Sequence, residues 1–92
     1  MAITVVNGTP AQNLEFSIAG VVDGSAQPPM WSGSLNPMYT SGWQIKMAVS
    51  GYDLYSVSFY TVGYNGNDLA AATSQPVPDE SMVSLSINVF PI

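Results

Sequence analysis

The 92-residue sequence contains no cysteine, no histidine and no arginine, and its only basic side chain is one lysine. Without cysteine the chain forms no disulfide bond, and without cysteine or histidine it lacks the usual ligands of zinc, copper and iron. A Ser–His–Asp triad is excluded for the same reason. We therefore expect a protein that is not an enzyme and that binds no cofactor.

Charge is also scarce, because only 8% of the residues are charged, against about a quarter in an average soluble chain. The net charge is −5. Nucleic-acid binding needs several lysines or arginines to neutralise phosphates, so it is excluded, and anionic membranes are disfavoured. The polar surface must instead come from neutral groups, of which there are 12 Ser, 5 Thr, 6 Asn and 4 Gln.

Long hydrophobic runs are missing too. No stretch approaches the roughly 20 apolar residues of a transmembrane helix, and the start has neither the basic segment nor the apolar run of a signal peptide. We expect a cytoplasmic protein, one exported without a standard signal, or a mature form. The length fits a single domain over residues 1–92.

What the sequence does contain is alternation of apolar and polar residues with a period of two, which is typical of half-buried β-strands. The pattern covers 14–22, 43–50 and 81–90, and a β-branched run at 3–6 adds another strand. The aromatic residues at the apolar positions of the predicted strands are assigned to the core: Phe16, Trp43, Tyr55 and Phe59.

The segment 52–64 is longer and changes its apolar phase between Phe59 and Tyr60, which indicates a β-bulge or a strand that crosses between two sheets. A weaker strand covers 69–74. The segment 75–80 contains two prolines and cannot pair as a central strand. With turn signals between the strands, the sequence predicts an all-β protein, an antiparallel β-sandwich of about six or seven short strands.

Candidate ligand-binding residues lie in the Pro-, Gly- and Ser-rich stretch 27–42, which we expect to be a loop region. They are the methionine and aromatic residues of two similar short segments: Met30, Trp31, Met38 and Tyr39. Aromatic and methionine side chains there either cover the open end of the sandwich or form an exposed apolar patch that binds a partner. Both interpretations stay open from the sequence.

A calcium site is a further alternative, because Asn65, Asn67 and Asp68 offer oxygen ligands at alternating positions. The same Asn-Gly-Asn-Asp segment is also typical of a hairpin turn, which is the favoured interpretation. We expect no metal site.

The segments Ile3–Thr9 and Leu14–Ile18, followed by a loop leading to Trp31, resemble the start of small cysteine-poor β-sandwich proteins of fungi and bacteria. These are the aegerolysins, the actinoporin-like proteins and the small insecticidal β-sandwich proteins. The resemblance implies recognition of lipid or sphingolipid headgroups, sometimes with a partner that makes the pore.

Two hypotheses for function follow. The first is a non-enzymatic binding module that recognises neutral lipid headgroups or glycans through its aromatic and methionine residues, as a component of a defence toxin would. The second is a self-assembling structural protein, such as a filament, capsid or inclusion subunit, because few like charges oppose contact between copies. The expected partners are therefore a neutral lipid or glycan surface, or copies of the chain in a homo-oligomer.

Overall fold

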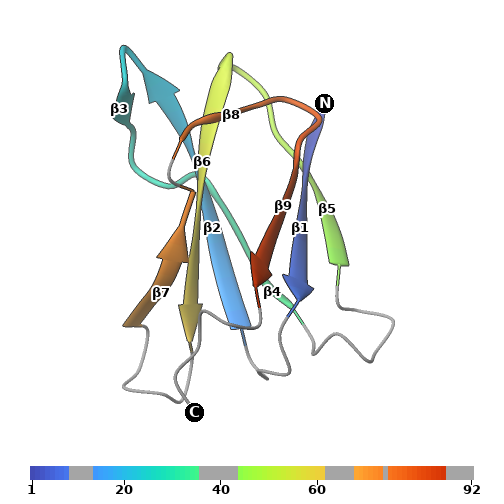
Figure 1. Ribbon diagram of the computed structural model, residues 1–92. Helices are drawn as coiled ribbons and strands as arrows, with labels where there is room; N and C mark the ends of the chain where they lie inside the picture. The colour runs from blue at the N-terminus through green and yellow to red at the C-terminus, as the bar shows by residue number, and fades with distance from the viewer. Residues whose placement is uncertain (9–13, 36–43, 62–67, 74, 87–92) are drawn as a thin grey trace.

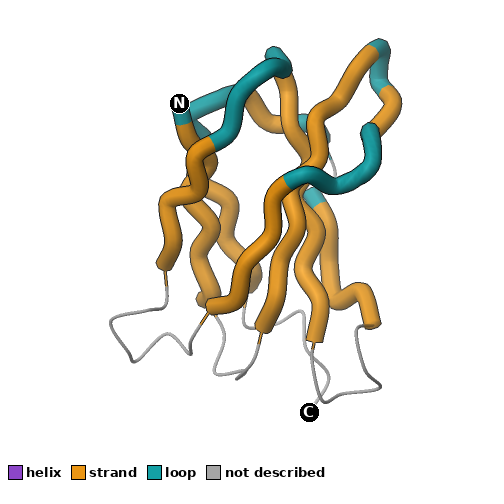
Figure 2. The backbone as a smooth tube through the Cα atoms, turned by 180° about the vertical axis from the view of Figure 1, so that it is seen from behind, coloured by secondary structure: helices purple, strands orange, loops and turns teal. Residues whose placement is uncertain are grey.

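The structure is a computed structural model that describes residues 1–8, 14–35, 44–61, 68–73 and 75–86. These residues form two β-sheets that pack face to face (Figure 1). Figure 2 shows strands and connecting loops but no helix in this part of the chain. The predicted all-β sandwich is confirmed. Among the described residues there is also no helix long and apolar enough to span a membrane.

The smaller sheet has three strands, with β1 (Ala2–Gly8) between β5 (Gln44–Ala48) and β9 (Met82–Ser86). β1 runs antiparallel to β5 but parallel to β9, so the first and last strands lie side by side in the same direction (Figure 1). This parallel pair is the one exception, among the described strand pairs, to the predicted antiparallel arrangement.

The larger sheet is built on β2 (Leu14–Val22) and β6 (Leu54–Thr61), which pair antiparallel along almost their whole length. The remaining strands flank this pair. β3 (Ser25–Ala26) and β4 (Trp31–Leu35) line the free side of β2, and β7 (Asp68–Ala72) and β8 (Val77–Pro78) line the free side of β6. β3 and β8 have two residues each, and the other seven described strands match the predicted number of strands.

The core lies between the two sheets and follows the predicted alternation. Its buried side chains are Ile3, Val5, Leu14, Phe16, Ile18, Leu35, Val49, Tyr55, Val57, Phe59, Val83 and Leu85. The core assignments of Phe16, Tyr55 and Phe59 are thus confirmed, while Trp43 lies outside the described residues. Val22 shares the inward phase of β2 but is 46% exposed, because it stands at the end of the strand, at the turn to β3.

The predicted irregularity at Phe59 and Tyr60 is present, and the structure shows which strand carries it. Phe59 pairs with Ala71 and Tyr60 with Leu69, so Ala70 is the extra residue and the bulge lies in β7. β6 itself stays in register with β2 throughout. β6 therefore keeps its regular alternation through Tyr60 and, as far as the strand is described, does not cross between the sheets.

The expectation of a loop throughout 27–42 is wrong for Trp31–Leu35, which form β4. Between β3 and β4 the ladder along β2 is interrupted where Pro28 and Pro29 lack backbone donors. The flanking residues hold the interruption in place, because Gln27 N donates to Gly20 O at 2.8 Å and Met30 N donates to Ile18 O at 3.1 Å. Because prolines are typical of loops, the sequence did not indicate that a strand begins two residues after Pro29.

Candidate binding site

Trp31 is the first residue of β4 and lies opposite Ile18, on the inner side of the larger sheet. Its indole packs edge-on against two tyrosines, with ring centroids 6.5 Å from Tyr52 and 5.9 Å from Tyr55. The tyrosine rings are in turn 6.1 Å apart, and Tyr55 is fully buried. Trp31 is half-buried and packs against the core. Its geometry therefore matches the interpretation of a side chain that covers the end of the core.

Met30 is different, because its side chain is 62% exposed. Its Sδ accepts a 3.7 Å hydrogen bond from the Tyr52 hydroxyl. Tyr52 thus brings Met30 and Trp31 together, although no sequence pattern singles it out. An aromatic residue after a Ser-Gly turn carries no signal that separates a ligand contact from core packing.

The other predicted site residues are not assembled by the described part of the chain. Met38, Tyr39, Asn65 and Asn67 lie outside it, and Asp68 begins β7. Among the described residues, no three His, Cys, Asp or Glu side chains come together as metal ligands.

A separate depression of about 400 Å³ lies on the outer face of the larger sheet, over β2, β4 and β6. We call it the serine groove, and it is lined by Glu15, Phe16, Ser17, Pro29, Ser32, Gly33, Ser34 and Tyr60. It is open to solvent along one side of the sheet. The predicted alternation over 14–22 puts Glu15 and Ser17 at polar positions of their strand, but no sequence pattern indicates this site.

Strand register builds the serine groove. Ser17 lies opposite Ser32 on β4 and Ser58 on β6. In the adjacent row, Glu15 lies opposite Ser34 and Tyr60. Residues two apart on a strand share a face, and neighbouring strands are about 4.8 Å apart, so the two rows form a platform about 10 Å wide. Polar positions from three strands therefore converge on one surface.

Gly33 lies between the two serine rows of the groove and is paired with Phe16. A β-carbon at position 33 would lie 2.9 Å from the Phe16 ring, on the inner side of the sheet. The glycine lets the buried phenylalanine cover the backbone from the inside. The outer side there presents backbone between the serine rows.

The serine groove presents hydrogen-bonding groups and an aromatic surface. Three serine hydroxyls both donate and accept, the Glu15 carboxylate accepts, and Tyr60 adds an aromatic surface. Glu15 is half-buried and has no ion-pair partner among the described residues. The groove lining contains no histidine or lysine, so Glu15 is its one ionisable side chain besides the Tyr60 phenol.

The chain matches no protein-family model, and no curated protein and no solved structure is significantly similar to it. The resemblance to the small fungal and bacterial β-sandwich proteins therefore stays a prediction.

Proposed function

We propose that this protein is a non-catalytic binding module that recognises neutral glycans in the serine groove. The observation that carries the proposal is the alignment of Glu15 and Tyr60 with three serines in one open depression. Of the two neutral ligands expected from the sequence, this arrangement favours a glycan over a lipid headgroup.

The groove suits a sugar because each sugar ring presents both hydroxyl groups and an apolar C–H face. Serine hydroxyls exchange hydrogen bonds with sugar hydroxyls, and a carboxylate such as Glu15 accepts two of them in charge-assisted bonds. The Tyr60 ring provides a flat apolar surface with a polar tip. A phosphate or sulfate group would instead face Glu15 on a chain of net charge −5, which opposes its binding.

The shape of the groove adds to the argument. It lies on a sheet face and stays open to solvent, so a ligand can extend beyond it along the strands. Pro29 precedes β4 and Tyr60 lies on β6, so the strands on both sides of β2 contribute to its lining. Such a site fits an internal stretch of an oligosaccharide chain better than a small molecule that must be enclosed.

The test is calorimetric titration with neutral gluco-, xylo-, manno- and chito-oligosaccharides. Tyr60→Ala should weaken binding at least tenfold, and Glu15→Gln about tenfold, since a hydrogen bond to a charged group contributes about 1.5–3 kcal/mol. Two matched controls should keep wild-type affinity. Tyr60→Phe retains the ring, and Asp53→Asn removes an exposed carboxylate outside the groove.

Vesicles of phosphatidylcholine and sphingomyelin form the second arm. The glycan proposal is wrong if no neutral oligosaccharide binds, or if both groove variants bind as the wild type does. Vesicle binding that is lost in Met30→Ser would replace it with the lipid alternative, because Met30 is exposed beside Tyr52 and lies outside the groove lining.

A further inference from the structure

The open edges of the two sheets differ in how they are protected against pairing with another chain. Natural sheets protect edge strands with prolines, bulges, short strands or outward lysines. Along β3 and β4 the edge is interrupted at Pro28 and Pro29, and along β7 and β8 it carries a bulge and Pro78. β5, at one edge of the smaller sheet, carries the exposed Lys46. Each of these three edges therefore carries a feature that opposes pairing with a strand of another chain.

The remaining edge, β9, has none of these features. Its five residues, Met82–Ser86, include no charge, proline or glycine, and the strand has no bulge in its pairing with β1. Among the described residues, β1 is the only strand that pairs with it. Met82 is 68% exposed and Ser84 is also exposed, so their side chains point away from the core.

The orientation of the free backbone groups follows from one hydrogen bond. Thr4 N donates to Ser81 O at 2.9 Å, so residue 81 faces β1. In a parallel ladder alternate residues of a strand bond to the same neighbour. Val83 and Leu85 therefore direct their amide and carbonyl groups to β1, whereas Met82 and Ser84 direct theirs to the open edge.

We propose that the edge of β9 pairs with β9 of a second copy of this chain, which joins two three-stranded sheets into one six-stranded sheet. This surface lies on the smaller sheet and is independent of the serine groove on the larger sheet. A second copy suits the edge because an uncharged strand faces an equally uncharged strand, and the contact closes with two-fold symmetry.

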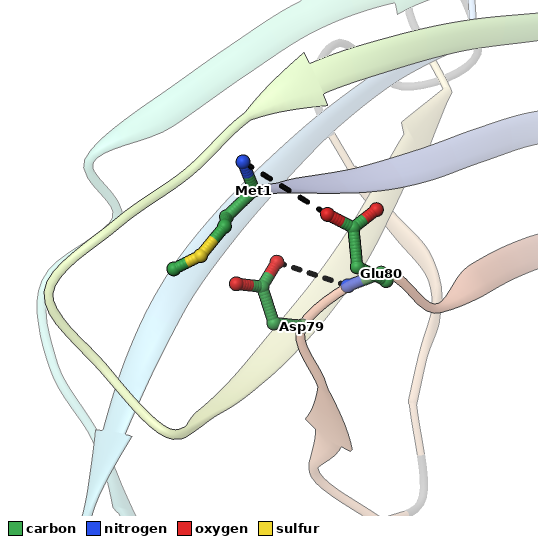
Figure 3. A network of polar contacts seen from close by, with 3 residues as sticks. All are labelled: Met1, Asp79 and Glu80. Carbon is green, nitrogen blue, oxygen red and sulfur yellow. Dashed lines mark hydrogen bonds and ion pairs between the residues drawn. The ribbon is translucent and has the colours of Figure 1, made fainter.

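The charges just before β9 decide the direction of pairing. Asp79 and Glu80 form the turn into the strand, where Asp79 Oδ1 accepts a 2.9 Å hydrogen bond from Glu80 N (Figure 3). A parallel pair would place these carboxylates beside their counterparts at about 5 Å, the distance between neighbouring strands. An antiparallel pair moves them to opposite ends of the new contact, where salt screens the repulsion.

The antiparallel pair centres on Ser84, which faces Ser84 of the second copy, while Met82 faces Ser86. In this register the outward amide and carbonyl groups of both strands face each other. Val83 and Leu85 keep their core positions in both copies. The association therefore needs no rearrangement of the described strands.

Sedimentation equilibrium and amide hydrogen exchange test the proposal on the wild-type chain. We expect a reversible dimer, and the exchange of the Met82 and Ser84 amides should slow as protein concentration rises, with Val83 unaffected. A protein that stays monomeric up to about 1 mM, where association is worth only about 4 kcal/mol, would overturn the proposal.

Variants locate the contact. Ser84→Pro removes a donor that β1 does not use, so the strand content should be retained while the dimer weakens at least tenfold. Ser84→Lys places two lysines opposite each other at the two-fold axis and should also weaken it. Gln44→Lys makes the same change in charge on β5, at the other edge of the same sheet, and should leave the dimer intact.

An equal loss of association in Ser84→Lys and Gln44→Lys would place the contact elsewhere and refute the β9 assignment. Oligosaccharide titration of Ser84→Lys separates the two proposals, because the serine groove should bind as in the wild type. If dimerisation fails and glycan binding persists, only the β9 inference is wrong.

Discussion

The ring of Tyr52 lies directly against the backbone of Gly20, so that a β-carbon at position 20 would overlap the ring. Gly20 has no left-handed backbone that would itself require glycine. The glycine is needed because an aromatic side chain occupies the space above it. This contact also holds Tyr52 in the position from which it touches Trp31 and Met30.

Gly20→Ala should therefore lower the free energy of unfolding by about 1–3 kcal/mol, the usual cost of overpacking. Urea denaturation measures it. In a Tyr52→Ala background the same substitution should cost almost nothing, because the clash has gone, and the double-mutant cycle isolates that coupling. Equal costs in both backgrounds would show that Tyr52 does not rest on Gly20.

Trp31→Ala should destabilise the protein by about 3 kcal/mol, since it removes a large side chain that packs on two tyrosine rings. Trp31→Phe should retain most of that stability, because an aromatic ring still contacts Tyr55. Chemical denaturation and near-ultraviolet circular dichroism report both effects. An unchanged stability of Trp31→Ala would instead favour the exposed-patch interpretation of this residue.

Thr73 joins the end of β7 to β6, because its Oγ1 accepts a 3.1 Å hydrogen bond from Val57 N. Thr73→Val has a similar shape but leaves that half-buried amide without its acceptor, so we expect a loss of about 1–3 kcal/mol. Thr73→Ser keeps the hydroxyl and should cost less. The exchange rate of the Val57 amide should rise in the valine variant only.

Glu80 has a left-handed backbone, with φ of 66°, in the turn before β9. Glu80→Gly removes the steric cost of about 1–2 kcal/mol for a side chain in this region, and part of the gain is offset by the greater freedom of glycine in the unfolded chain. We expect a net stabilisation of about 0.5–1 kcal/mol, measured by thermal unfolding.

Glu80→Gln is the matched control, because it removes the charge and keeps the β-carbon. The amino group of Met1 lies 3.9 Å from Glu80 Oε1, with both side chains largely exposed, so this contact should add little. If the glutamine and glycine variants change stability equally, charge and not backbone strain determines the behaviour of this turn.

Much of the fold was predictable because strand alternation is a local property of the chain. The segments 14–22 and 43–50 contain strands with the expected inward residues, and the segment 81–90 does so for its described part. A bulge was also predicted at Phe59 and Tyr60, where the pairing of β6 with β7 shifts. These features depend on neighbours a few residues apart, which the sequence displays directly.

The strand β4 and the parallel pairing of β9 with β1 were not predictable in the same way. Trp31–Leu35 contains three small residues and follows two prolines, so its composition is typical of a loop. Its strand conformation depends on hydrogen bonds to β2. The pairing of the first strand with the last depends on contacts between residues about 78 positions apart, such as Thr4 and Met82.

By itself, the sequence determined that a Ser–His–Asp triad and the usual histidine and cysteine ligands of zinc, copper and iron are excluded wherever the chain folds, because it contains no histidine and no cysteine. It also determined that polar strand positions would carry neutral hydroxyl groups. Only the tertiary structure decided which of those positions meet. Strand register placed Glu15, Ser34 and Tyr60 in one row, and strand order left β9 at an edge, because pairing between distant strands is set by packing of the whole sandwich.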